Sequence, residues 1–171
     1  MDRATQRILG AGALAGGLLR VGNTFTASML SPDALQLSYA VTDIFLLIGL
    51  AGILLCWRVE LERLGYAGIG IAVLGLIVIR GTGFTALAMQ GYMIGAAVSV
   101  IGVALLAADM LWRRIGSRIA PYLWLASFAL AMWSAFGGQA TIQALAGIAF
   151  GAGFAVAGID LLARSGAPEA A

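Results

Sequence analysis

Long apolar stretches alternate along the chain with short polar segments that hold most of its charges. Each of six such stretches is long enough to cross the hydrocarbon core of a bilayer, which is about 30 Å thick and takes about 20 helical residues. The pattern predicts six transmembrane helices over residues 8–30, 36–57, 64–86, 91–112, 120–137 and 142–163. The connections are too short for a soluble domain. We therefore expect an all-α integral membrane protein in which residues 1–171 form a single six-helix transmembrane domain.

The composition agrees with this pattern. Of 171 residues, 61% are hydrophobic and only 11% are charged, whereas about 25% are charged in an ordinary soluble domain. So few polar side chains cannot cover a globule in water, so membrane lipids are the expected surroundings. No nucleic-acid partner is expected, because the arginines stand at predicted helix ends and form no basic patch.

The distribution of arginines orients the predicted bundle. One set of connections carries Arg3, Arg7, Arg58, Arg63, Arg113, Arg114, Arg118 and Arg164. The opposite set has only Arg20 and Arg80 at its edges. Basic loops stay on the cytoplasmic side, so both termini are expected in the cytoplasm, with the first stretch an uncleaved helix. The use of arginine as the only cation, beside abundant Ala and Gly, suggests a bacterial source and therefore a multi-pass protein of the cytoplasmic (inner) membrane.

The six predicted helices follow one another as three helical hairpins. The second helix of each hairpin begins near a glutamine and ends at an arginine. Two of them end alike, as "DMLWR" and "DLLAR", where an Asp precedes an Arg by one helical turn. We therefore predict inner interfacial salt bridges between Asp109 and Arg113 and between Asp160 and Arg164. Whether the three hairpins are a true repeat is left open. The aromatic residues near these basic ends are expected to form an interfacial belt: Trp57, Trp112, Tyr122 and Trp124.

The chain contains 24 glycines, several of which are spaced as GxxxG pairs. Small residues on one helix face let two helices approach closely in lipid. Two interpretations follow: a homo-oligomer or membrane-partner interface, or packing within the bundle itself. We favour internal packing, because six helices have many interfaces of their own to fill. The pairs are Gly12 and Gly16, Gly91 and Gly95, and Gly147 and Gly151.

Two arginines and one aspartate interrupt the apolar stretches. Arg20 lies roughly 20 Å beyond Arg7, and Asp43 lies roughly 22 Å before Arg58, at about 1.5 Å per helical residue. An arginine inside a bilayer is costly and should find a partner, so these depths predict an Arg20–Asp43 ion pair. Arg80 is expected nearer the outer interface, reaching toward water.

A second interpretation gives the same charges a functional role. They would belong to a polar pocket in the outer half of the bundle that binds an anion or a lipid headgroup through guanidinium groups. The residues of this predicted pocket are Arg20, Asp43, Arg80, Asn23 and Gln90.

The residue types present argue against most catalytic chemistry. The chain has no histidine, which argues against histidine-ligated haem and zinc, and no lysine, which argues against a Schiff base. Cys56 is the single cysteine, so no internal disulfide is expected. We therefore expect no metal, no cofactor and no enzymatic activity.

Two functions remain open from the sequence. The first is a non-enzymatic accessory or scaffold component that acts by packing against partners or lipids. The alternative is a small-solute or anion transporter or channel that uses the predicted pocket. They differ in one structural feature: a pathway needs inward-facing polar side chains at several depths, whereas a scaffold can be dry throughout.

Overall fold

The computed structural model describes residues 2–82 and 88–166, and within these ranges it consists of six helices and no strands. This confirms the all-helical prediction. The helices are α1 (Arg3–Thr26), α2 (Pro32–Cys56), α3 (Arg63–Thr82), α4 (Ala88–Arg113), α5 (Ile119–Gly137) and α6 (Ala140–Gly166). The end of the third predicted span, residues 83–86, lies outside the described residues.

The first two helices begin earlier than the apolar pattern predicts, because capping residues precede the apolar stretches. Asp2 accepts a hydrogen bond from the backbone N–H of Thr5 at 2.6 Å and so starts α1 at Arg3. Ser31 caps α2, and Pro32 occupies its first turn, where a missing N–H costs nothing. The predicted spans begin only at residues 8 and 36. The polar first turns of both helices therefore belong to the helices as well.

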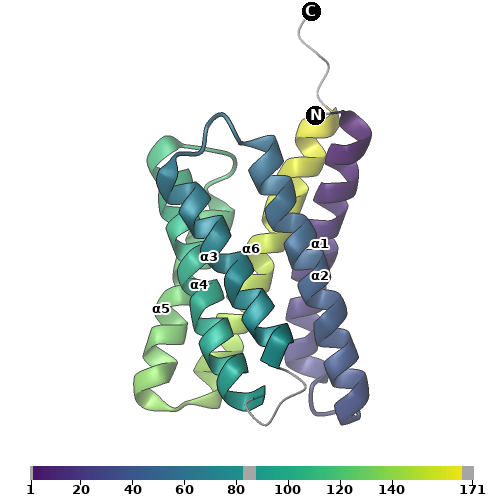
Figure 1. The fold of residues 1–171 in the computed structure, drawn as a ribbon, viewed down its shortest axis with the longest axis vertical. Helices are drawn as coiled ribbons and strands as arrows, with labels where there is room; N and C mark the ends of the chain where they lie inside the picture. The colour runs from purple at the N-terminus through teal and green to yellow at the C-terminus, as the bar shows by residue number, and fades with distance from the viewer. Residues whose placement is uncertain (1, 83–87, 167–171) are drawn as a thin grey trace, which may run out of the picture.

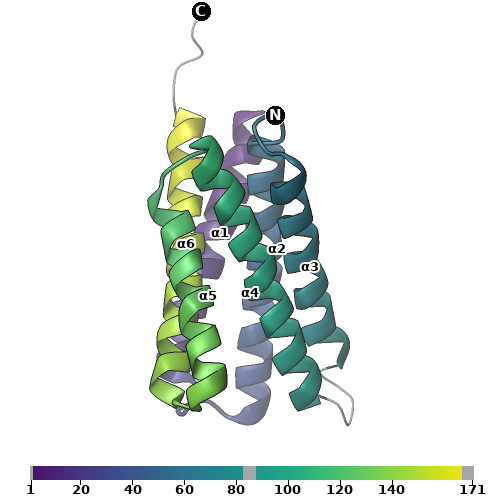
Figure 2. The ribbon, with the colours of Figure 1, turned by 90° about the vertical axis from the view of Figure 1, so that its left-hand side faces the viewer.

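The six helices lie roughly along one common axis (Figures 1 and 2), and their contacts join them in a closed ring. Consecutive helices are neighbours, and α1 closes the ring by packing along α6. The start of α1 and the end of α6 lie at the same end of the bundle (Figure 1), called here the termini end. The opposite end, with the α1–α2 connection and the α5–α6 turn, is called the distal end. α3 packs closely on α4 but touches α2 at few places, so the α2–α3 seam is sparsely packed.

Five helices, α2 to α6, are long and apolar enough to cross a membrane, a pattern typical of a membrane protein. α1 is not among them, because it carries several polar and charged residues, including Arg7, Arg20 and Asn23. It nevertheless packs between α2 and α6 in the same ring.

Glycines allow the close contacts between neighbouring helices. A Cβ on Gly16 would lie 2.9 Å from the backbone nitrogen of Leu46 in α2, and one on Gly95 would lie 2.6 Å from the carbonyl oxygen of Gly75 in α3. A Cβ on Gly151 would lie 2.7 Å from the carbonyl oxygen of Gly17 in α1. One member of each GxxxG pair thus meets the backbone of another helix of the same chain. The glycine faces hold this bundle together by backbone-to-backbone packing.

Large side chains fill the half of the bundle toward the termini end. Trp57 and Trp124 are 0% and 1% exposed, and Trp124 meets Phe154 edge-on with ring centroids 5.2 Å apart. The prediction of an interfacial belt is therefore wrong for these two tryptophans, whereas Trp112 and Tyr122 are exposed. Trp124 fits inside the bundle because Gly153 lacks the Cβ that would collide with its indole.

Candidate functional site

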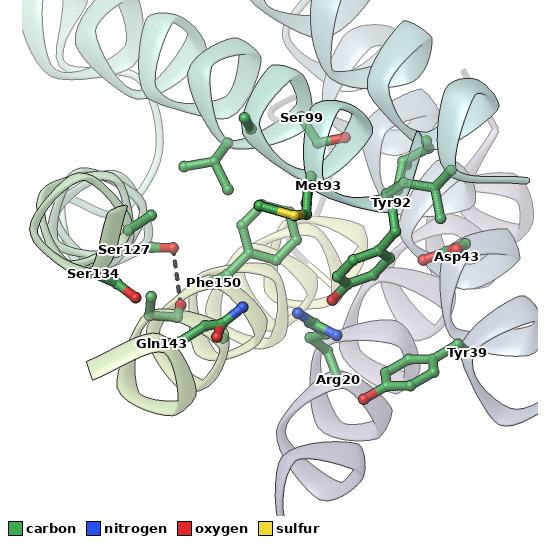
Figure 3. Close-up of a pocket in the computed structure, with 18 of the residues that line it drawn as sticks. Arg20, Tyr39, Asp43, Tyr92, Met93, Ser99, Ser127, Ser134, Gln143 and Phe150 are labelled. Carbon is green, nitrogen blue, oxygen red and sulfur yellow. Dashed lines mark hydrogen bonds between the residues drawn. The ribbon is translucent and has the colours of Figure 1, made fainter. Parts of the chain in front are cut away.

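A cavity of about 530 Å³ lies inside the ring, in the half toward the distal end, and residues of all six helices line it. It extends from Gly138, in the α5–α6 turn, to Ser99 and Ser127 near the middle of α4 and α5. Its wall is mixed, with polar side chains set among apolar ones (Figure 3). The polar members are Arg20, Tyr39, Asp43, Arg80, Tyr92, Ser99, Ser127, Ser134 and Gln143.

Two serines mark the closed end of the cavity. The Ser99 hydroxyl donates to the carbonyl oxygen of Ala72 at 3.2 Å and so joins α4 to α3. The Ser127 hydroxyl donates to the carbonyl oxygen of Ala146 at 2.9 Å and so joins α5 to α6. Beyond them the apolar core of the termini half begins. The cavity therefore ends near the middle of the bundle.

An ion pair crosses the cavity wall from α3 to α2. The Nε and terminal nitrogen of Arg80 lie 2.6 and 2.5 Å from the same Asp43 oxygen. The Asp43 side chain is 13% exposed and that of Arg80 is 34% exposed. The structure thus pairs Asp43 with Arg80 and not with Arg20. Arg80 lies in the last turn of α3, and its side chain lines the cavity. Depth along a helix is the basis of the prediction, and depth does not specify toward which neighbour a side chain turns.

Arg20 has no ion-pair partner within 4 Å in the part of the chain that the structure describes. Its guanidinium carbon lies 5.6 Å from the centre of the Tyr39 ring, a cation–π contact. It also attracts Asp43 electrostatically, more weakly than Arg80 does. In Figure 3 its side chain extends into the cavity, with the polar ends of Tyr92 and Gln143 directed toward the same space.

Glycines in α6 make room for the Arg20 side chain. A Cβ on Gly151 would lie 3.0 Å from the Cβ of Arg20, and one on Gly147 would lie 3.5 Å from an Arg20 terminal nitrogen. The third GxxxG pair therefore does two things. It brings α6 close to α1, and both of its glycines lie beside the Arg20 side chain.

The other two predicted pocket residues do not line the cavity. Asn23 is 4% exposed; its amide nitrogen donates to Thr42 at 3.0 Å, and its amide oxygen accepts from Ser38 at 2.7 Å. It links α1 to α2 next to the cavity wall. Gln90 is exposed and does not line the cavity. Of the five residues predicted for the pocket, the structure brings Arg20, Asp43 and Arg80 together around one space.

The aspartates near the termini end hold backbone groups. Asp109 accepts a hydrogen bond from the backbone N–H of Glu62 at 3.1 Å, and Asp160 accepts one from that of Ser117 at 3.0 Å. Each aspartate thus holds the start of the preceding helix of its own hairpin, α3 or α5. This shared contact is a structural likeness between the second and third hairpins.

The predicted salt bridges at this end have different outcomes. Arg113 lies 3.6 Å from Asp109, as predicted, and also pairs with Glu62. Asp160 and Arg164 are not within 4 Å of each other in the described structure, and the Arg164 guanidinium lies over the Trp57 ring at 5.1 Å. The helical spacing alone does not reveal this competing aromatic partner.

Most of the polar cavity wall is not predicted from the sequence. Tyr39, Tyr92, Ser134 and Gln143 carry no charge signal, and Gln143 stands out only as the start of a hairpin's second helix. Among the described residues, no group of three or more His, Cys, Asp or Glu side chains could hold a metal ion. Comparisons with protein-family models, with curated proteins and with solved structures find no significant match to this chain.

Proposed function

We propose that this chain is a small-solute transporter that binds its solute in the cavity of the distal half. The observation that carries the proposal is the cavity itself, with polar side chains at more than one depth. Its volume of about 530 Å³ lies within the range of roughly 300–1,000 Å³ typical of small-molecule sites. Its mixed lining, mostly apolar with a few convergent polar groups, is also typical of such sites.

The closed end of the cavity favours a carrier over a channel. A channel needs a continuous polar path, but the termini half is filled by buried Trp57, Trp124 and Phe154. A carrier holds its solute near the membrane midplane and opens to one side at a time. A cavity that ends near the middle of α4 and α5 fits one state of such a cycle.

The sparsely packed α2–α3 seam marks where one part of the bundle can move against the rest. α3 and α4 pack closely together, so they can act as one unit against the other helices. The Asp43–Arg80 ion pair bridges this seam beside the cavity. A solute that changed this contact would alter how the two parts of the ring fit together.

The proposed setting is the cytoplasmic membrane of a bacterium, with six crossings and both termini in the cytoplasm. The basic connections at the termini end support this orientation. The distal cavity would then open away from the cytoplasm.

The accessory or scaffold function is the second proposal and has less support. It draws on glycine faces that could serve as an interface with a partner. Gly16, Gly95 and Gly151 instead face the backbones of other helices of this chain. A scaffold also has no need of an internal cavity with charged walls.

A cavity-filling variant tests the proposed function. The protein, in zwitterionic lipid nanodiscs, is heated with small organic anions, cations and neutral molecules, and its unfolding midpoint is measured. A solute that binds the folded state raises this midpoint. We expect at least one class of solute to raise the unfolding midpoint of the wild type. The same solute should raise the midpoint of Ala129→Phe, because Ala129 is exposed on α5. It should not raise that of Ala131→Phe, because Ala131 lines the cavity. Equal responses of the wild type and Ala131→Phe would contradict solute binding in this cavity.

A further inference from the structure

The charges of the cavity wall do not balance. Arg80 and Asp43 neutralise each other, because their opposite unit charges are in direct contact, at 2.5 and 2.6 Å. Among the described residues, no carboxylate lies within 4 Å of Arg20. Its positive charge is therefore not neutralised by an ion pair. The cavity wall therefore carries an excess of one positive charge.

A positive charge in this position calls for an anion. An arginine inside a membrane-spanning helix is costly unless a partner compensates its charge. The Tyr39 ring attracts the guanidinium through a cation–π contact, but among the described residues no carboxylate lies within 4 Å to compensate its charge. A carboxylate, sulfonate or phosphate oxygen pair matches the planar guanidinium fork.

The apolar part of the cavity wall indicates the chemistry of the rest of the ligand. Leu46, Leu76, Val100 and Phe150 line the same cavity and offer apolar surface beside Arg20. A hydrated inorganic anion would leave this surface in contact with water. An acyl chain or an aromatic ring would cover this surface, and burial of apolar area away from water is favourable.

We infer that the cavity binds an organic monoanion with an apolar body, whose negative group pairs with Arg20 and whose body lies against the apolar wall around Phe150. This inference rests on the proposed solute-binding function and adds the class of solute. One uncompensated positive charge matches one negative charge on the ligand. The anion can come from the water at the distal end or from the membrane, as a fatty acid or an acidic lipid, since both sources share this chemistry.

Octanoate and octanol test the inference, because they share an apolar chain and differ in charge. Binding is measured from the unfolding midpoint of the protein in phosphatidylcholine nanodiscs. For the wild type, we expect a dissociation constant for octanoate at least about tenfold lower than that for octanol. A hydrogen-bonded charge pair in a half-buried site supplies a difference of this size. Arg20→Gln should abolish this preference, and Arg20→Lys should retain part of it. Arg63→Gln, an exposed arginine at the start of α3, should behave as the wild type.

The possible results separate the inference from the function on which it rests. Equal binding of octanoate and octanol by the wild type would overturn the inference and leave solute binding intact, and this comparison needs no variant. An octanoate preference that survives in Arg20→Gln would also overturn it. Failure of both compounds to bind the wild type would count against the proposed function itself.

A second lipid composition identifies the source of the anion. Nanodiscs that contain phosphatidylglycerol should weaken octanoate binding to the wild type if an acidic lipid occupies the cavity. They should leave it unchanged if the anion comes from water. Either result supports the assignment to Arg20, provided that Arg20→Gln abolishes the octanoate preference.

Discussion

Arg20 and Arg80 stand in similar sequence surroundings but have different environments in the fold. Arg80 forms a close ion pair with Asp43, whereas Arg20 faces the cavity with an aromatic neighbour. The sequence predicts that both lie within or beside the membrane and that an aspartate neutralises one of them. The matched depths predict Arg20 as the partner, which is wrong, because the rotation of α2 about its axis depends on how α1 and α3 pack against it.

Double substitution can show which arginine is the partner of Asp43. Asp43→Leu strands Arg80, and Arg80→Met strands Asp43. Breaking a buried pair costs about 3–5 kcal/mol, and we expect the lower end because the Arg80 side chain is 34% exposed. The double variant Asp43→Leu, Arg80→Met should recover most of this loss in a chemical-denaturation or thermal-melting series.

The control for this cycle combines Asp43→Leu with Arg20→Met. No recovery is expected there, because the two side chains form no ion pair. Recovery with Arg20→Met but not with Arg80→Met would show that the pairing in the structure is wrong.

At the scale of the helices, glycines decide which faces meet. The GxxxG spacing indicates close packing, and one member of each pair lies against a neighbouring helix of the chain. The spacing does not indicate that Gly147 and Gly151 also lie beside the Arg20 side chain. That placement depends on the register between α1 and α6, which no pattern within either helix contains.

Two glycines of α1 offer a matched test of this packing. Gly17 lies against the backbone of α6 at Gly151 and Ala155, whereas a Cβ on Gly22 would meet no neighbouring helix within 4 Å. Gly17→Leu should therefore cost at least about 1–3 kcal/mol of stability through overpacking and reduce the yield of folded protein. Gly22→Leu should be tolerated, because leucine has a higher helix propensity than glycine. Similar yields and melting temperatures for the two variants would contradict the close α1–α6 contact.

At the scale of the whole molecule, the sequence predicts the helical class and the approximate position of every helix. Apolar length and basic connections carry that information directly. The closed ring, the filled termini half and the open distal half come from contacts between helices far apart in the chain. Ser99 and Ser127 illustrate this limit, because nothing in their local sequence shows that both lie at the closed end of one cavity.

The central claim is that a water-accessible cavity enters the bundle from the distal end and stops near its middle. Two alanines on one side of α4 test it, in a Cys56→Ala background that removes the only native thiol. Ala96 lines the cavity, and Ala107, three turns further along α4, is 0% exposed in the apolar core.

The measurement is the rate at which a charged, membrane-impermeant thiol reagent labels each cysteine variant when it is added outside intact cells. Gln90→Cys, at an exposed position near the start of α4, reports that the reagent reaches the distal end. We expect Ala96→Cys to react with the external reagent and Ala107→Cys to remain unlabelled. An Ala96→Cys variant as unreactive as Ala107→Cys, while Gln90→Cys is labelled, would contradict the cavity and with it the proposed binding site.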